Sequence, residues 1–203
     1  MSELLTFIQL GFRHIVDVGA TDHILFLLVL AAIYRFSDWR QAAWVVSAFT
    51  LGHSITLGLA VTGMLNLPVR LIEFLIPLTI VATGLENLLV RDRAAAPWSG
   101  RYRPVFAAVF GLVHGAGFAE YLRSLFMDHV AVPLFGFNVG IELGQIVVLA
   151  AAGALLFVLD RGLERLRLPP RAPSPLRLRV MTVSATVAVV ASVWAVQRTP
   201  WTW

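Results

Sequence analysis

The chain has 203 residues, of which 58% are hydrophobic and only 14% are charged. Its mean hydropathy of +0.79 is typical of a membrane protein and excludes an ordinary soluble domain. All sixteen basic residues are arginine, and the absence of cysteine excludes disulfides and thiolate metal sites. We expect no nucleic-acid partner despite the net charge of +4, because the arginines lie in the loops of a hydrophobic chain and favour a lipid bilayer surface.

Apolar stretches that are long enough to cross a bilayer, which takes about 20 residues, predict an all-α polytopic membrane helix bundle. Residues 1–17 are expected to form a short amphipathic or re-entrant helix that leads into the first span. The whole chain, 1–203, would be a single integral membrane domain with a five-helix functional core at 18–159 and a cytoplasmic Pro/Arg-rich linker at 160–177. We expect six transmembrane helices, at residues 18–35, 40–64, 68–90, 104–126, 132–159 and 178–197.

Arginines are concentrated in alternate loops, and this bias predicts the orientation of the chain. The side that holds the second and fourth loops carries only Arg13, Arg70, Arg123 and Arg198. Because positive residues are enriched in cytoplasmic loops, we expect the first, third and fifth loops inside and both termini outside. These three loops carry Arg35, Arg40, Arg91, Arg93, Arg101, Arg103, Arg161, Arg165, Arg167, Arg171, Arg177 and Arg179.

Ionisable residues surround the start of the first predicted span. His14, Asp17, Asp22 and His23 precede a run without charge, and such groups at the edge of a span indicate a functional site unless they are paired or solvated. At about 100° per residue, the nine steps from His14 to His23 place these side chains on opposite faces of a straight helix. We therefore expect either that Asp22 works with His14 or that the helix breaks within 17–21, where Gly19 is the candidate break point.

Polar side chains also lie inside the later spans. His53 and His114 are near the middle of the second and fourth spans, and Asn138 and Glu142 share one face of the fifth. The same two helices that hold His114 and Glu142 also carry glycine pairs. Gly111 with Gly115, and Gly140 with Gly144, have the four-residue spacing that allows another helix to approach closely. We expect these glycines to bring the fourth and fifth spans together.

The cost of burying polar groups in a bilayer favours one shared site. We expect His23, His53 and His114 to converge with Asp22 and Glu142. His14 would lie on the path to this centre, together with Glu73 and Glu86. The predicted metal ligands are His14, Asp22, His23, His53, His114 and Glu142, supported by the polar residues Asp17, Ser54, Glu73, Glu86, Asn87, Asn138 and Gln145.

The ligand set consists of imidazole, carboxylate and amide groups without sulfur. This set suits a borderline divalent ion such as nickel, cobalt or zinc, and it disfavours Cu(I). The ion would be either a transported substrate or a bound ion.

Five strings carry a resemblance to a known family: HIVDVGATDHILFLL, AFTLGHSITLGLA, LIEFLIPLTI with LEN, FGLVHGAGFAEYL and GFNVGIELGQ. Together they resemble the HupE/UreJ family of bacterial membrane proteins, over roughly residues 7–150 and in family order. The family is regarded as one of nickel or cobalt permeases, often associated with hydrogenase or urease maturation. The resemblance implies that His14, Asp22 and His23 bind the ion. For a bacterial membrane protein, the arginine bias then places the chain in the inner membrane with periplasmic termini.

The sequence leaves three functions open. A permease for a divalent transition metal ion is favoured over an enzyme, and ligands strung along a polar path would support it. A zinc-dependent intramembrane hydrolase that acts on lipid would instead need a fixed three-ligand site with a water and a lipid-sized opening. A non-transporting accessory or structural subunit would use the polar residues only to pack helices. The sequence also leaves open whether the chain forms a homo-oligomer.

Overall fold

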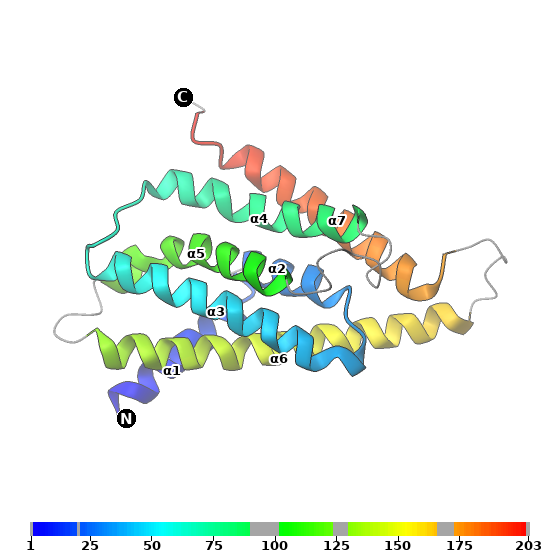
Figure 1. The fold of residues 1–203 in the computed structure, drawn as a ribbon, viewed down its shortest axis with the longest axis horizontal. Helices are drawn as coiled ribbons and strands as arrows, with labels where there is room; N and C mark the ends of the chain where they lie inside the picture. Colours follow the sequence, from blue (N-terminus) through cyan, green and yellow to red (C-terminus); the bar gives the residue numbers. More distant parts are fainter. Residues whose placement is uncertain (1, 20, 90–101, 124–129, 166–172, 202–203) are drawn as a thin grey trace.

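The computed structural model describes residues 2–19, 21–89, 102–123, 130–165 and 173–201. These ranges hold seven α-helices and no strand, so the predicted all-α fold is confirmed (Figure 1). A single turn of 3₁₀-helix at Phe36–Asp38 leads into the third helix. The helices are α1 Glu3–Val16, α2 Thr21–Ala31, α3 Trp39–Val61, α4 Val69–Leu89, α5 Tyr102–Arg123, α6 Ala131–Arg165 and α7 Pro175–Gln197.

Four helices, α3, α4, α6 and α7, are long and apolar enough to cross a membrane. Helices α1 and α2 meet the same criterion together, as one span that is bent by 68°. Helix α5 has 22 residues and occupies the position of the fourth predicted span, but it is not among the helices that meet this criterion over the described residues. Within the part of the chain that the structure describes there are thus four long apolar helices and one bent pair, as in a polytopic membrane protein.

The predicted break in the first span is confirmed. Helix α1 ends at Val16 and α2 begins at Thr21. The side chain of Asp17 accepts a hydrogen bond from the backbone N–H of Gly19 at 2.9 Å, a local turn that competes with helix continuation. The helix after the break has only 11 residues, so it is shorter than the predicted span 18–35 and is too short to cross a bilayer alone.

Glycines allow two pairs of helices to approach at backbone distance. A Cβ atom added to Gly111 of α5 would lie 2.1 Å from the carbonyl oxygen of Phe49 in α3. A Cβ atom added to Gly140 of α6 would lie 2.1 Å from the carbonyl oxygen of Ile8 in α1. The expectation that these glycines join the fourth and fifth spans is therefore wrong. Helical spacing identifies the close-packing face of a helix but not the helix that it meets.

Two buried polar side chains connect the remaining helices. The side-chain amide of Asn87 in α4 donates to the carbonyl oxygen of Val29 at 2.8 Å and to the hydroxyl of Ser184 at 3.1 Å. Arg179 of α7 donates to the carbonyl oxygens of Ala32 and Tyr34, at 3.1 and 2.9 Å, and pairs with Asp160 of α6. These carbonyls follow α2 directly, where the end of a helix leaves carbonyl groups without intrahelical partners.

The ends of the helices divide the bundle into two sides. Both termini and the connection from α3 to α4 lie at the left of Figure 1, and the turn from α2 to α3 lies at the right with the C-terminal end of α6. The predicted linker at 160–177 is shorter than expected, because α6 continues to Arg165 and α7 begins at Pro175. Residues 166–172 of this linker, and the arginines Arg91, Arg93 and Arg101, lie outside the described residues.

The tight contact between α3 and α5 predicts a sharp difference between glycine positions. Gly111→Ala would force the two backbones apart, and overpacking of this kind costs about 1–3 kcal/mol. Gly153→Ala is the matched control, because a Cβ atom on Gly153 meets no atom within 4 Å. Thermal unfolding of the purified protein should show a lower melting temperature for Gly111→Ala and an unchanged or higher one for Gly153→Ala. Equal melting temperatures for the two variants would contradict this packing.

Candidate metal centre

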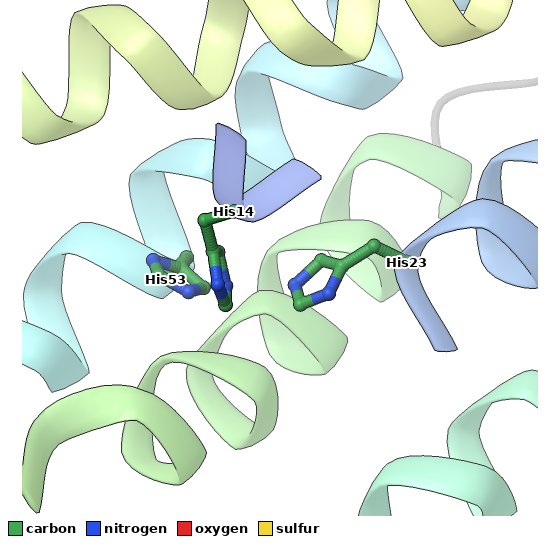
Figure 2. Close-up of side chains that lie close together, drawn as sticks. All are labelled: His14, His23 and His53. Atoms are coloured by element: carbon green, nitrogen blue, oxygen red, sulfur yellow. The ribbon is translucent and has the colours of Figure 1, made fainter. Parts of the chain in front are cut away.

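Three histidines from three helices meet inside the bundle. His14, His23 and His53 each offer one ring nitrogen, and these atoms all lie within 4.8 Å of one another. Figure 2 shows the three rings directed toward a common point. The ring centroids of His14 and His23 are 4.7 Å apart, and each of these rings is 6.4 Å from the ring of His53.

The break between α1 and α2 brings His14 and His23 together. His14 lies in the last turn of α1, whereas His23 lies in the first turn of α2. On a straight helix the two side chains would face opposite directions, but the 68° bend turns them toward each other. His53 is positioned differently, from the middle of α3, where its backbone packs against Gly115 of α5.

The cluster, defined here as His14, His23, His53 and His114, contains imidazole nitrogens without partners. Among the described residues, five of these nitrogen atoms are buried and make no hydrogen bond: Nε2 of His14, Nε2 of His23, both ring nitrogens of His53 and Nδ1 of His114. Buried polar atoms in native proteins are almost always paired, so each exception requires an explanation. A cation shared by several imidazoles would take the lone pair of one nitrogen on each ring, because the other nitrogen of a neutral imidazole carries the proton.

Asp22 orients one of the rings. Its Oδ1 atom lies 3.2 Å from Nδ1 of His23, and the same oxygen accepts a hydrogen bond from the His23 backbone N–H at 2.9 Å. A carboxylate in this position holds the Nδ1–H tautomer and leaves Nε2 as the free lone pair. Asp22 is thus placed to orient His23 through Oδ1, and its role as a direct ligand stays a prediction.

His114 stands at the edge of the cluster. Its ring centroid is 5.4 Å from that of His23, but its Nε2 atom lies 2.9 Å from the hydroxyl of Thr79 in α4. The three-histidine group does not include it. His114 therefore keeps one free nitrogen, Nδ1, and uses the other to connect the cluster to α4.

Phenylalanine rings flank the histidines, of which His23, His53 and His114 are buried and His14 is half-buried. The ring of Phe118 is 3.9 Å from that of His14, and Phe137 stacks on Phe118 at 5.4 Å. On the other side, Phe49 lies 5.1 Å from His114 and stacks on Phe26. A low-dielectric surrounding of this kind strengthens the interaction between a bound cation and its ligands.

Glu142 does not join the histidines. Its carboxylate accepts a hydrogen bond from the hydroxyl of Ser47, and it lines a cavity of about 760 Å³ to which no histidine among the described residues contributes. Glu142 follows Phe137, which contacts the cluster, by five residues. Five helical steps turn a side chain by roughly 140° beyond one full turn, so Glu142 faces elsewhere.

The carboxylates predicted for the path lie at opposite ends of the bundle. Glu73 is exposed and lines a pocket with Arg70 and Arg198 near the C-terminal end of α7. Glu86 accepts hydrogen bonds from Tyr102 and Arg103 at the other end. Neither residue contacts the histidines.

The other predicted supporting residues make local contacts. Gln145 accepts a hydrogen bond from the hydroxyl of Thr50 at 2.7 Å, and Ser54 donates to the carbonyl oxygen of Thr50 at 2.6 Å. Asn138 keeps a buried Oδ1 atom without a partner. Asn87 connects helices, and Asp17 forms the turn after α1.

Two hydroxyl residues were missed by the sequence reasoning. Thr79 contacts His114, and Ser47 contacts Glu142. Both lie in apolar helices. The signal available in the sequence was a hydroxyl residue at helical spacing from another polar residue of the same helix. Their partners lie on other helices, so periodicity within one helix could not assign them.

Three imidazoles that share one point, with a carboxylate behind one of them, can bind a borderline divalent ion. The geometry requires neutral rings, because only an unprotonated nitrogen offers its lone pair.

A family model described as "HupE / UreJ protein" matches residues 1–198, which is nearly the whole chain. Comparisons with curated proteins and with solved structures gave no match.

The position of Asp22 predicts a specific loss of metal affinity. Asp22→Asn removes the charge that holds the His23 tautomer, and loss of such an orienting group typically weakens metal binding by about 10–100-fold. Asp17→Asn is the matched control in the same stretch, because Asp17 is exposed and contacts only the Gly19 backbone. Titration of the purified protein with Ni²⁺ checks this. An equal effect of both substitutions would contradict the role given to Asp22.

Proposed function

We propose that this chain, which belongs to the HupE/UreJ family, is a membrane permease for a divalent transition metal ion. Nickel or cobalt is the first candidate substrate, and zinc is the second. The observation that carries the proposal is the group of buried imidazole nitrogens without partners at the meeting point of His14, His23 and His53.

The nature of the ligands supports a transported ion. Three neutral imidazoles provide no negative charge, and the one carboxylate at the site, Asp22, is directed at His23. Such a site can hold a dication without the affinity of a thiolate or multi-carboxylate site, and a transporter must release what it binds. Glu142, on the wall of the cavity that reaches toward Asp160 and Glu164, is the proposed next contact for the ion.

The proposed orientation follows from the arginines. The end of the bundle that carries Arg35, Arg40, Arg103 and Arg161 would face the cytoplasm of a bacterial cell, and both termini would be periplasmic. In this orientation the ion would enter the protein from the periplasmic side of the inner membrane. A role beside urease or hydrogenase maturation, which need nickel, would be consistent with this direction.

A zinc-dependent hydrolase is the second candidate, because three histidines around one point are also the protein ligands of some catalytic zinc sites. Such an enzyme needs a lipid-sized opening to the metal. The cavity of about 760 Å³ is lined by Glu142 rather than by any described histidine. Release of fatty acid or head group from vesicle lipid by the zinc-loaded protein would favour this function over transport.

Replacement of His53 tests the permease most sharply. Both ring nitrogens of His53 are buried without partners, so His53→Leu removes polar atoms that nothing in the bundle satisfies. We expect the metal-free variant to be at least as stable as the parent, while uptake of Ni²⁺ into proteoliposomes falls at least tenfold. The parent should gain about 2.7 kcal/mol of stability at a Ni²⁺ concentration of 100 times its Kd, and His53→Leu, which has one ligand fewer, should gain much less.

Ser54→Ala is the matched control on the same helix, because the Ser54 hydroxyl bonds only to the carbonyl oxygen of Thr50. It should keep both uptake and the metal-induced stabilisation. If His53→Leu loses stability without metal but keeps its response to Ni²⁺, the histidines only pack helices and the permease is refuted.

A further inference from the structure

Two helix pairs in this bundle pack by the same contact. In the pair of α1 and α6, a Cβ atom on Gly11 would lie 2.0 Å from the Phe137 carbonyl oxygen, and one on Gly140 would lie 2.1 Å from that of Ile8. In the pair of α5 and α3, the same distances are 2.1 Å from Gly111 to Phe49 and 2.0 Å from Gly52 to Ala108.

The register of the two contacts is also the same. Gly11 faces the carbonyl of Phe137, three residues before Gly140, and Gly140 faces that of Ile8, three residues before Gly11. The two glycines of the second contact obey the same rule. Gly111 faces Phe49, three residues before Gly52, and Gly52 faces Ala108, three residues before Gly111. The shared register relates the pair α1–α6 to the pair α5–α3, and the positions of His14 and His114 match α1 with α5 and α6 with α3.

Side chains at the site obey the same correspondence. His14 follows Gly11 by three residues, and His114 follows Gly111 by three. Phe137 lies 5.7 Å from His14, and its counterpart Phe49 lies 5.1 Å from His114.

The aromatic surroundings extend this correspondence. Each of these phenylalanines stacks on a further ring: Phe137 on Phe118, at 5.4 Å, and Phe49 on Phe26, at 4.8 Å. Phe118 is adjacent to His14, and Phe26 is adjacent to His114. Phe118 belongs to the second half of α5, and Phe26 belongs to α2, the second half of the bent span.

The two pairs run in opposite directions. Helices α1 and α6 point one way in Figure 1, and α3 and α5 point the other way. Helices α4 and α7 fit the same correspondence. Each is the last helix of its half of the chain, and the two pack on each other, with Gly84 against Ala188. The order is thus α1, α3, α4 in the first half and α5, α6, α7 in the second. This is the arrangement of an inverted-topology repeat, in which the substrate site lies between the repeats.

We propose that residues 3–89 and 102–197 form an inverted repeat, and that the pairs α1–α6 and α3–α5 move against each other as two rigid bodies when the ion binds. The inference rests on the proposed function, because the moving boundary is the one that the transported ion occupies. His14 belongs to one body and His53 to the other, so an ion held by both fixes the position of one body relative to the other.

The contacts within and between the bodies differ in kind. Within each body, backbone meets backbone at the glycines, and sliding would place atoms in collision. Between the bodies, the described contacts include side-chain hydrogen bonds, from Ser47 to Glu142 and from Thr50 to Gln145. Side-chain bonds of this kind can break and reform. The cavity of about 760 Å³ at the same boundary leaves room for the movement.

The absence of cysteine makes a distance measurement direct. Spin labels on Leu51→Cys of α3 and Leu143→Cys of α6, both exposed, report on the boundary between the bodies. Labels on Leu51→Cys and on Leu112→Cys of α5 report within one body and serve as the matched control. With saturating Zn²⁺, a diamagnetic probe, we expect the Leu51–Leu143 distance to shift and the Leu51–Leu112 distance to stay fixed. If neither distance shifts, or both shift alike, the rigid-body proposal is overturned.

Cross-linking gives a functional reading of the same movement. Oxidation of Gly58→Cys/Leu134→Cys, between the bodies, should reduce Ni²⁺ uptake at least tenfold, and a reductant should restore it. Phe7→Cys/Gly136→Cys lies within one body, where the added Cβ of residue 136 is 3.1 Å from the Cβ of Phe7, and its oxidation should leave uptake unchanged. Equal effects of the two cross-links would overturn the proposal.

The choice of pair and a separate readout keep the test decisive. The Cβ position of Gly58 is 3.2 Å from the Leu134 side chain across the boundary between the bodies, and neither residue belongs to the proposed ion path. A parent protein without any uptake would refute the proposed function. The spin-label distances would still decide whether the two bodies move when metal binds.

Discussion

Polar atoms inside a bilayer must find partners within the protein, because the hydrocarbon around it offers none. The histidine cluster does not meet this requirement by itself, since five of its ring nitrogens are buried and unbonded. The surrounding structure keeps them in that state. Phenylalanine rings fill the space beside the histidines, and hydrogen bonds with Asp22 and Thr79 occupy only one ring nitrogen each of His23 and His114. We propose a shared cation as the partner for the lone pairs that remain on these rings.

Two structural devices place these nitrogens. The bend after Val16 turns His14 and His23 toward each other, although a straight helix would place their side chains on opposite faces. The glycine contacts hold α5 against α3 and α6 against α1, which fixes His53 and the aromatic walls. Because each glycine contact joins backbones directly, the site depends on helix pairs rather than on flexible loops. A cluster that spans two such pairs is suited to couple ion binding to their relative position.

The sequence was sufficient for the fold class, the break and most members of the cluster, because hydropathy and helical angle are properties of one segment. It failed where the answer depends on a second helix. Glu142 shares a face with Asn138, but that face meets Ser47 and a cavity rather than the histidines. His14 was expected outside the centre and is one of its three closest members, because the angle of the bend cannot be read from residue spacing. The helices that pack against Gly111 and Gly140 could likewise not be predicted from the sequence.

X-ray absorption at the nickel edge tests the central claim most directly, because it reports the atoms bound to the ion. In the Ni²⁺-loaded protein we expect the outer-shell scattering of imidazole from about three histidines. The spectrum of His53→Leu should lose one of these contributions, and that of Ser54→Ala should be unchanged. A nickel ion coordinated only by oxygen, or a spectrum that is identical in the parent and His53→Leu, would contradict the assignment of the histidine cluster as the metal site.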